Sequence, residues 1–387
     1  MEMLKERLKL LDKWIVIPFI VLILFSIIAV YSASNYSAME EFGNPNYYLV
    51  RQSIVVFISL FIAFFVYIFP FRVLKKKKTI LFGTVVIFAL LTIVFFLPAR
   101  LGARRWIPLP VFNLQPAEFA KVFVIWYLAY IFSRNQKELE SEFLQTIMKP
   151  SILVGAIFFL ILLEPDTGTA IIIALITVSM LSASGASLKY GLSFILFGVL
   201  LVGGLTFIIY KFGDSIPILG YRYDRFLGLW DPFGYYESYG NQLVNSYYAL
   251  SRGRIFGVGI GNSVQKTGYL PFPYTDFIMA IIGEELGLAG VTAILVALGM
   301  IIGRAFYLGS RSKDSFNSLI YIGVGSMLLS QTLINLAGLT GLIPITGVTF
   351  PLLSYGGSSL LVVSISIALI ANASTQDRLN EKKLKKN

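Results

Sequence analysis

The sequence contains neither cysteine nor histidine in its 387 residues. The absence of cysteine excludes disulfide bonds and thiol nucleophiles, and the absence of both residues removes the usual ligands of zinc. Without histidine, Ser-His-Asp triads and the commonest general base are excluded as well. An enzyme built from this chain must therefore move protons with Asp, Glu, Lys or Tyr.

Charged residues are also scarce, at 14% of the chain against 56% hydrophobic residues, and the mean hydropathy is +0.76. This much apolar surface indicates a polytopic membrane protein. Orientation in the membrane and contact with anionic lipid explain the net charge of +11, so we expect no nucleic-acid partner. The first apolar segment lacks a small-residue cleavage motif, and we expect it to remain as an anchor.

A membrane-spanning helix needs about 20 apolar residues. The candidate spans are residues 14–34, 47–69, 79–97, 116–133, 150–163, 168–184, 190–211, 277–303, 316–341 and 350–373. The fifth and sixth are short and flank Glu-Pro-Asp-Thr-Gly, so they are either two spans or one broken element. We expect an all-α polytopic membrane protein with about ten transmembrane helices, forming a single domain over residues 1–387.

The charge distribution predicts the orientation of these spans. Most of the 32 Lys and Arg residues fall on one side when the N-terminus is placed inside, and they include the run from Lys75 to Lys78. The positive-inside rule then puts the tails, residues 1–13 and 374–387, in the cytoplasm. The segment 212–276, between the seventh and eighth spans, becomes a large extracellular loop, and an ordered loop of that length is usually functional.

Ionisable residues in or beside a span cost about 3 kcal/mol or more, so each is a functional candidate. Glu118 and Lys121 are three residues apart and share a helix face, either as a structural ion pair or as the wall of a substrate cavity. Arg51 and Arg105 lie at the outer interface. They either snorkel or bind a diphosphate, for which the planar guanidinium is well suited.

Two further groups have alternative interpretations. Glu164 and Asp166 flank a helix break, where Asp166 either caps the next helix or joins Glu164 in contacting a metal ion or sugar hydroxyls. The segment Pro-Leu-Leu-Ser-Tyr-Gly-Gly-Ser-Ser-Leu, with Ser354 and Ser358, enters the last span. Its small residues either permit close helix packing or form an anion cradle at a helix start.

The segment from Gly268 to Gly287 passes from a Pro-rich loop into an apolar helix. Asp276 stands at that junction, either as the helix N-cap or as a base at the mouth of a membrane cavity. At ~1.5 Å per residue, Glu284 lies ~12 Å deeper and becomes a candidate cavity residue, whereas we expect Glu285 to pair with a neighbouring helix. All these groups project to the outer side, which indicates a site for a polar, anionic lipid headgroup.

The motifs resemble those of the SEDS family (shape, elongation, division and sporulation). Gly-Ala-Arg-Arg-Trp-Ile, Leu-Gln-Pro-Ala-Glu-Phe-Ala-Lys, Glu-Pro-Asp-Thr-Gly, Thr-Asp-Phe-Ile-Met-Ala-Ile-Ile-Gly-Glu-Glu-Leu-Gly and the serine-rich motif occur in the family's order. Together they cover the chain from the third span to the last. Residues 241–250 and 259–266 are similar to the division branch, FtsW, rather than to the elongation branch, RodA.

The resemblance implies a ten-span peptidoglycan glycosyltransferase that polymerises lipid II on the outer face of the cytoplasmic membrane, at the division septum. It implies lipid II, undecaprenyl diphosphate-linked glycan, a class B penicillin-binding protein and other division proteins as partners, and a divalent cation, Mg²⁺ or Mn²⁺, as a cofactor. The family's catalytic Asp falls on Asp276. Phe272 and Tyr274 replace a Glu and a His that are common in the family motif, which removes two side chains that could contact a metal or headgroup.

The family's cavity residues correspond to Glu118, Lys121, Arg51, Arg105, Glu164 and Asp166. In the implied reaction Asp276 accepts the proton of an acceptor 4-hydroxyl, and an inverting displacement releases undecaprenyl diphosphate. The candidate cations for the leaving charge are Arg51, Arg105, Lys121, Arg225 and Arg252. The alternative function is a lipid II flippase, which would also need a charged cavity and broken helices, although the sequence has no recognisable inverted repeat.

Overall fold

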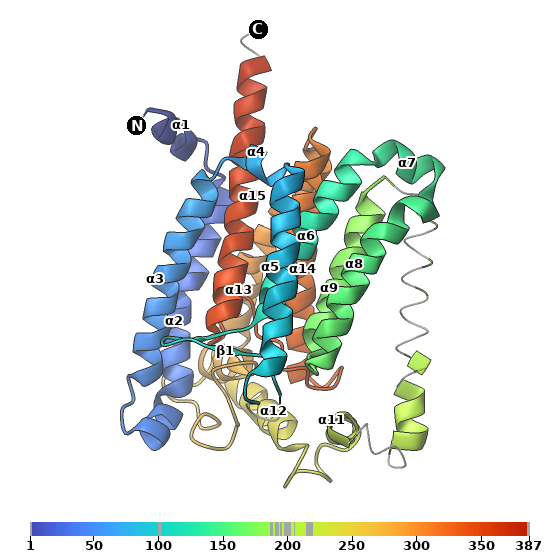
Figure 1. Ribbon diagram of the computed structural model, residues 1–387. Coiled ribbons are helices and arrows are strands. Elements are labelled where there is room, and N and C mark those ends of the chain that lie inside the picture. Colours follow the sequence, from blue (N-terminus) through green and yellow to red (C-terminus); the bar gives the residue numbers. More distant parts are fainter. Residues whose placement is uncertain are drawn as a thin grey trace.

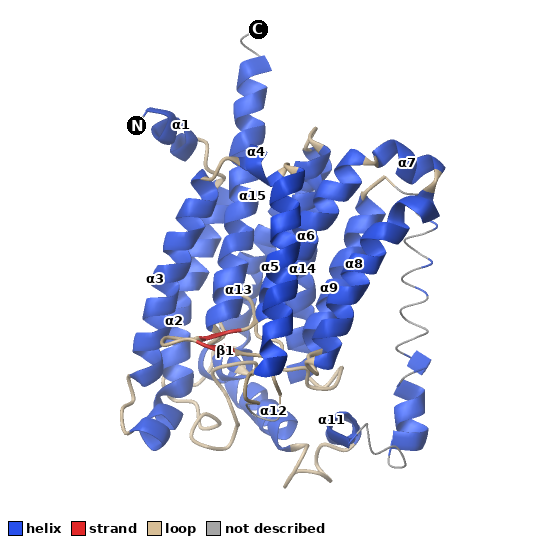
Figure 2. Ribbon diagram, viewed as in Figure 1, coloured by secondary structure: helices blue, strands red, loops and turns tan. Residues whose placement is uncertain are grey.

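The computed structural model describes residues 2–99, 103–185 and 220–384, together with residues 206–213 and a few positions between residues 186 and 204. Figure 1 shows a bundle of long helices with both chain ends at one end of the bundle. Figure 2 shows that the described strands form only a small hairpin, β1 (Ile107–Pro108) and β2 (Asn113–Leu114), at the side of this helical body. The expected all-α class is confirmed.

The long helices account for the predicted spans in the described part of the chain. They are α2 (Lys13–Phe42), α3 (Tyr47–Ile68), α5 (Lys77–Ile93) continued by the 3₁₀ turn η1 (Val94–Phe96), α6 (Pro116–Arg134), α8 (Phe143–Leu163), α9 (Thr167–Ala183), α13 (Ile278–Arg311), α14 (Ser315–Leu339) and α15 (Gly357–Leu384). Eight of these segments are long and apolar enough to cross a membrane, and α9 is a shorter apolar helix. The seventh predicted span, residues 190–211, lies mostly outside the described residues.

Several helices are longer than their apolar centres. Helix α2 runs through polar residues to Phe42 and ends at Gly43, whose left-handed backbone places its N–H on the carbonyl of Met39. Helix α8 begins seven residues before the predicted start at 150, and α15 begins at Gly357 rather than 350. Hydropathy locates the part of a helix inside the apolar layer, whereas capping and loop contacts decide where the helix ends.

The alternative between one broken element and two spans is resolved at residues 164–166. Helices α8 and α9 are separate, lie side by side in Figure 1 and are joined by this short turn, so they run antiparallel. Asp166 ends the turn by capping α9, since its Oδ1 accepts a hydrogen bond from the backbone N–H of Thr169 at 3.1 Å.

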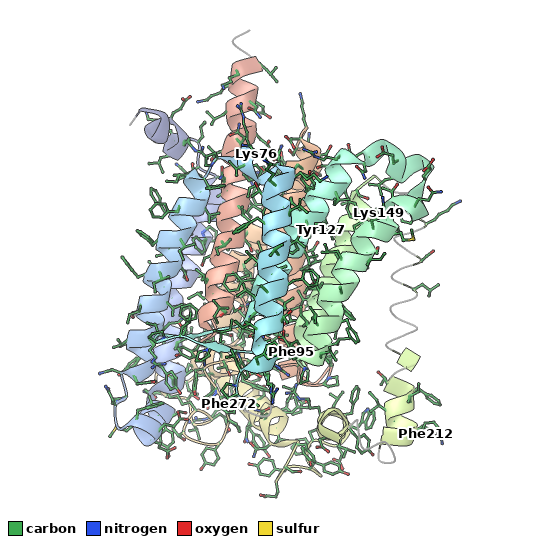
Figure 3. All side chains as sticks on the ribbon, viewed as in Figure 1. Lys76, Phe95, Tyr127, Lys149, Phe212 and Phe272 are labelled. Atoms are coloured by element: carbon green, nitrogen blue, oxygen red, sulfur yellow. The ribbon has the colours of Figure 1, made fainter. Side chains whose placement is uncertain are left out.

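The end of the bundle that carries the termini is held together by ion pairs. Asp12 is fully buried, caps α2, and accepts hydrogen bonds from Arg304 of α13 and Arg378 of α15. Short helices α1 (Glu2–Lys9), α4 (Phe71–Leu74) and α7 (Gln136–Ser141) lie at this end. Figure 3 places Lys76 and Lys149 toward the same end and Phe272 near the opposite one.

The opposite end is covered by the predicted long loop, much of which is folded. It contains α11 (Gly220–Trp230) and α12 (Asn241–Gly253), which Figure 1 shows beneath the bundle. Helix α12 is fastened to the body where Ser246 Oγ donates to the carbonyl of Leu339 at 2.8 Å and Asn245 Nδ2 donates to the carbonyl of Tyr269 at 2.9 Å. The segment therefore forms a fixed cover over this end of the spans.

Helix α13 is broken at Gly287, which has φ +67° and ψ −169°. The segment 254–259 fits against the break, with hydrogen bonds from Val258 N to Glu284 O at 3.0 Å and from Leu288 N to Arg254 O at 2.9 Å. A Cβ at position 287 would clash with the carbonyl of Ile255. Glycine is required here for both the backbone angle and the close approach, and the inserted segment satisfies backbone groups that the break would leave unpaired.

Candidate active site

Asp276 lies just before α13 and does not cap it. The N-cap residue is Phe277, and no side chain makes a capping hydrogen bond there. The partly buried carboxylate of Asp276 instead accepts a hydrogen bond at Oδ1 from Thr275 Oγ1 at 2.8 Å. The ordinary structural explanation of this residue is therefore wrong, and its carboxylate is available for chemistry.

Burial raises the pKa of the Asp276 carboxyl group above its ordinary value. The hydrogen bond from Thr275 and the positive charge of Arg225 both lower this pKa, but by less than burial raises it. A general base works best when its pKa is brought toward the operating pH. The surroundings of Asp276 therefore shift it in the direction that base catalysis requires.

The backbone of Asp276 is held by α14, the helix at the centre of the bundle. Asn335 Nδ2 donates to the carbonyl of Asp276 and to the carbonyl of Val348, each at 2.7 Å. One turn earlier on the same face, Gln331 accepts from Lys121 Nζ at 3.2 Å and donates to the carbonyl of Thr349 at 3.0 Å. A single helix face thus positions both the Asp276 loop and the buried lysine.

Lys121 is paired with Glu118 as the spacing predicts. Its Nζ lies 2.9 Å from Glu118 Oε2, and the lysine side chain is fully buried. The contact with Gln331 places Lys121 one helical turn of α14, ~5.4 Å along its axis, from the residue that holds Asp276. The ion pair and the backbone of the Asp276 loop are therefore attached to the same face of α14.

The connection between α14 and α15, residues 340–356, gathers the rest of this region. Carbonyls of this connection accept hydrogen bonds from Arg225 at Ile345, from Asn335 at Val348 and from Gln331 at Thr349. Its Tyr355 also donates its backbone N–H to the carbonyl of Tyr274 at 2.8 Å. The Asp276 loop, α11 and α14 are thus joined through one stretch of backbone.

Arg105 and Asp166 are engaged with the turn between α8 and α9. Arg105 Nε donates to the carbonyl of Glu164 at 2.8 Å, and its guanidinium also contacts the carbonyl of Pro165. Besides capping α9, Asp166 accepts from Gln115 Nε2 at 2.7 Å. Of the two interpretations, capping is the one seen for Asp166.

Glu164 differs from its neighbours because its carboxyl group is buried and has no hydrogen-bond partner among the described residues. Burial, with a smaller contribution from the Asp166 charge, raises the pKa of Glu164 to about 8, although Arg105 acts to lower it. The side chain is therefore mostly protonated at neutral pH.

Ser354 and Ser358 hold backbone at the start of α15. Ser354 Oγ accepts from the N–H of Phe350 at 2.8 Å. Ser358 Oγ donates to the carbonyl of Asn113 at 2.9 Å and accepts from the N–H of Gln115 at 2.8 Å. The Ser358 hydroxyl is thus used as both donor and acceptor in packing β2 against α15, whereas the Ser354 hydroxyl is used as an acceptor.

Arg51 stands beside a cluster of tyrosines. Its guanidinium lies over the ring of Tyr47, with Cζ 4.5 Å from the ring centroid. Within the cluster, the Tyr274 hydroxyl donates to the Tyr48 hydroxyl at 2.9 Å, and both rings contact Tyr355. Tyr274, at the position where the family commonly has His, therefore packs the Asp276 loop against α3.

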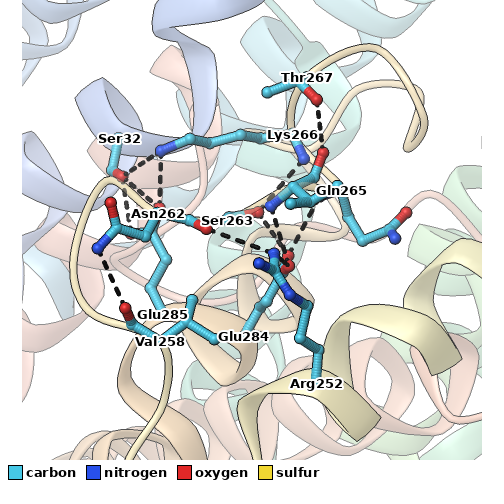
Figure 4. Close-up of polar contacts among 11 residues, drawn as sticks. Ser32, Arg252, Val258, Asn262, Ser263, Gln265, Lys266, Thr267, Glu284 and Glu285 are labelled. Carbon is cyan, nitrogen blue, oxygen red and sulfur yellow. Dashed lines mark hydrogen bonds and ion pairs between the residues drawn. The ribbon is translucent and has the colours of Figure 1, made fainter.

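Glu284 and Glu285 are placed in a separate polar cluster, shown in Figure 4. Glu284 is fully buried and is bound to Arg252 at 2.8 Å, to Ser263 Oγ and to the backbone N–H groups of Val264 and Gln265. Its carboxylate thus fastens the segment after α12. This position differs from that of the predicted cavity group around Asp276.

Glu285 pairs with Lys266 at 2.7 Å and accepts from Ser32 Oγ of the neighbouring helix α2. The expected partner on another helix is present, and a loop lysine that the sequence analysis did not identify joins it. The motif at residues 259–266 supplies Ser263, which binds Glu284, and Lys266, which binds Glu285. It therefore fastens the loop to both glutamates.

The donors around Asp276 do not fit a protein-held metal site. Within the described residues, no group of three or more His, Cys, Asp or Glu side chains could hold a metal ion. A hard divalent cation prefers several oxygen ligands, frequently from more than one carboxylate. Tyr274 is committed to the tyrosine cluster, so it does not extend the donor set at Asp276.

Sequence reasoning missed Gln331 and Asn335 as positioning residues. Both are amides within an apolar span, four residues apart, in Ser-Gln-Thr-Leu-Ile-Asn. That spacing places two hydrogen-bonding side chains on one buried face of the helix. The pattern could have been found in the sequence, but the search considered only charged residues in the spans.

Comparison with known proteins shows the family. A model of the FtsW, RodA and SpoVE family, described as cell cycle protein, matches residues 12–379. The probable peptidoglycan glycosyltransferase FtsW of Bacillus subtilis (strain 168) is 39% identical over 393 residues, covering 99% of this chain and 95% of the relative. The protein of the same description from Lactococcus lactis subsp. lactis (strain IL1403) is 38% identical, covering 95% and 93%.

Solved structures show the same fold. A chain from the work described as "Structural coordination of polymerization and crosslinking by a peptidoglycan synthase complex" matches with a TM-score of 0.74 at 24% identity, covering 95% of this chain and 98% of that one. The Rod shape determining protein RodA of Thermus thermophilus matches with a TM-score of 0.65 at 21% identity, covering 95% and 97%. The motifs, the full-length relatives and the fold agree: this chain belongs to the FtsW, RodA and SpoVE family of cell cycle proteins, the SEDS family, on the FtsW side.

Proposed function

We propose that this protein is a peptidoglycan glycosyltransferase that polymerises lipid II on the outer face of the cytoplasmic membrane during cell division. The observation that carries the proposal is Asp276, a carboxylate beside a membrane helix that does not cap that helix and whose pKa is raised by burial. The names of the FtsW relatives support the same activity.

In the proposed reaction Asp276 accepts the proton of the 4-hydroxyl of an acceptor lipid II as that oxygen attacks the anomeric carbon of the growing strand. The new glycosidic bond forms while the bond to the diphosphate oxygen breaks, and undecaprenyl diphosphate leaves with the electron pair. The displacement inverts the anomeric configuration. The proton on Asp276 then returns to solvent, which restores the base.

The charge that develops on the diphosphate requires nearby cations. We assign this role to Arg51, Arg225 and Lys121. Arg225 acts on the carboxyl group of Asp276, and Lys121 is bound to the same face of α14 as the Asp276 loop. Arg105 and Arg252 are assigned structural roles, since Arg105 binds the turn between α8 and α9 and Arg252 binds Glu284. Arg225 also binds a carbonyl, that of Ile345, but its charge acts on Asp276 as well. The residues that the structure describes do not form a protein-held site for Mg²⁺ or Mn²⁺, so the developing charge is assigned to the side chains of Arg51, Arg225 and Lys121.

The same proposal includes an orientation and partners. We infer that both termini and the lysine-rich end are cytoplasmic, which follows from the positive-inside rule and leaves Asp276 at the outer side. A class B penicillin-binding protein and other division proteins are the proposed partners at the septum. The similarity in fold to a chain of a peptidoglycan synthase complex supports an assembly of this kind.

The test is a lipid II polymerisation assay on purified protein, with and without a cognate class B penicillin-binding protein whose transpeptidase is blocked. Asp276→Asn preserves the shape of the side chain and removes the base, so we expect a folded protein that makes no strands. Wild-type rates from this variant would refute the assignment. If neither protein made strands with the partner bound and divalent cation present, lipid II transport would become the better interpretation.

A further inference from the structure

A cavity of about 360 Å³ lies at the end of the molecule covered by α11 and α12. It is enclosed by α11, the turn after it, the first residues of α12, Pro271 of the Asp276 loop, and residues 343–345 of the α14–α15 connection. Pro271 belongs to the Asp276 loop, and Asn335 binds both the backbone of Asp276 and the α14–α15 connection, so the cavity lies close to the candidate base.

The lining combines an apolar floor with neutral polar groups. Leu229, Leu243, Pro271 and Ile343 supply apolar surface, whereas Ser238, Asn241 and Gln242 supply a hydroxyl and two amides. The side chain of Gln242 makes no hydrogen bond to any described residue. It is therefore free to bind a ligand.

The lining of the cavity includes one half-exposed aromatic ring, that of Tyr239. Tyr239 is 47% exposed, and its hydroxyl is hydrogen-bonded to Asp224 of α11. A fixed ring presents a flat apolar face, and amides at its edge can bind hydroxyl and acetamido groups. This combination suits the apolar faces and polar edges of a sugar ring.

The cavity is preformed by tight backbone contacts. A Cβ at Gly228 would clash with the carbonyl of Tyr239, and a Cβ at Gly240 would clash with the carbonyl of Pro232. The anchoring of α12 through Ser246 fixes the opposite wall. A rigid site avoids the entropy cost of ordering its side chains when a ligand binds.

We propose that this cavity is a subsite for an uncharged N-acetylated sugar of the glycan strand, beyond the sugar that reacts at Asp276. The proposal rests on the proposed polymerase function. The volume lies at the small end of the roughly 300–1,000 Å³ typical of ligand sites, which suits a mono- or disaccharide unit. The charged groups in the lining are Arg225, assigned above to the diphosphate, and the exposed Glu237, so a neutral sugar fits better than a charged peptide.

A direct binding experiment tests the subsite without requiring polymerisation. Soluble β-1,4-linked N-acetylglucosamine oligomers are titrated against the full-length protein in detergent, with maltose oligomers as the unrelated control. We expect Gln242→Ala and Tyr239→Ala to weaken binding about tenfold, the value of one lost hydrogen bond or ring contact of ~1.4 kcal/mol. Tyr239→Phe keeps the ring but loses the contact of the hydroxyl with Asp224, so its affinity should fall between those of Tyr239→Ala and the wild type.

Tyr235→Ala is the matched control, because Tyr235 is in the same turn and is 38% exposed but does not line the cavity. Failure of the wild type to bind the oligomers, or equal binding by Gln242→Ala, Tyr239→Ala and wild type, would overturn the subsite. Binding of a free stem peptide, lost in the same variants, would also overturn the assignment to a sugar.

Strand length provides a second readout that separates this inference from the activity itself. We expect the two cavity variants to release strands several-fold shorter than the wild type, because the growing strand is held less firmly. Unchanged strand lengths would contradict the subsite. The two proposals can also fail separately. If the wild type bound the oligomers but made no strands, and the cavity variants lost that binding, the subsite would be supported and polymerisation refuted.

Discussion

At the residue scale, the hydrogen bond from Thr275 to Asp276 should control the pH dependence of the reaction. Burial raises the pKa of Asp276 and this bond lowers it, so Thr275→Ala should raise the pKa further. The base must be ionised to act. The rate, which rises with pH through this pKa, should then reach its plateau at a higher pH than in the wild type.

The measurement is a pH–rate profile of strand synthesis for Thr275→Ala, with Thr275→Ser as the control that keeps the hydroxyl. We expect the serine variant to follow the wild-type profile and both variants to reach similar plateau rates. An acid limb that stays in place in Thr275→Ala would show that this bond does not act on the titrating group.

Glu164 should make the stability of the protein fall as pH rises. Its pKa is raised from 4.5 to about 8 in the folded protein. Between these values the folded state retains a proton that the unfolded state loses, so the free energy of unfolding decreases with pH and levels off above the folded pKa. Glu164→Gln removes this loss, so its stability relative to the wild type should increase from pH 5 to pH 8.5.

Thermal unfolding in detergent at several pH values provides the check. Glu237→Gln, which changes an exposed carboxylate between α11 and α12, is the matched control. A constant difference between Glu164→Gln and the wild type would mean that the Glu164 carboxyl group is not held protonated.

Single residues were predictable where their chemistry conflicts with a membrane. A charge beside apolar residues is costly, which is why the sequence singles out Glu118, Lys121 and Asp276. In the structure, one face of α14 holds both Lys121 and the backbone of Asp276. Tyr274 and Asn335 gave no such signal. Their roles depend on partners in distant parts of the chain, Tyr48 and the Asp276 carbonyl.

At the element scale, the break in α13 should depend on glycine at position 287. Gly287→Ala forces an unfavourable left-handed angle and a clash with segment 254–259, and strain of this kind alone costs on the order of 1–3 kcal/mol. Gly299→Ala, in the same helix with open space around its Cβ, should be neutral or slightly stabilising. Thermal unfolding of both variants in detergent tests this, and equal effects would contradict it.

The Lys266–Glu285 pair should behave as a coupled unit. Both side chains are buried, so Lys266→Met alone leaves an uncompensated carboxylate, with a cost of about 3–5 kcal/mol. Adding Glu285→Gln should recover a large part of that loss. The comparison is between the single and double variants in thermal unfolding, and an additive loss would argue against a buried ion pair.

Sequence patterns predicted the spans but not this break. Apolar runs are local, so hydropathy located the helices without knowledge of their neighbours. The residues around Gly287 read as a continuous helix, because the segment that opens it ends almost thirty residues earlier in the chain. The cover formed by α11 and α12 was recognised only as a long loop for a similar reason, since α12 is held by contacts with the distant helices α13 and α14, and α11 packs against α12.

At the scale of the whole molecule, the absence of cysteine makes the proposed orientation directly testable. Single cysteines can be placed at exposed positions without removing any native thiol. In intact cells, Thr267→Cys should react with a membrane-impermeant maleimide and Lys77→Cys should react only after permeabilisation. The reverse labelling pattern would show the opposite orientation, with Asp276 on the cytoplasmic side, and would contradict the proposed reaction at the outer face.

The α14–α15 connection joins the outer part of the molecule chiefly through its carbonyl oxygens, at Ile345, Val348 and Thr349. Every amino acid has a carbonyl, whereas few have the amide or guanidinium that binds it. In each contact, the residue that supplies the carbonyl should therefore tolerate more substitutions than the residue whose side chain binds it. In a saturation library selected for growth, Gln331 and Asn335 should reject nearly all replacements, while the half-buried Ile345 should accept many, although all three belong to the same set of contacts.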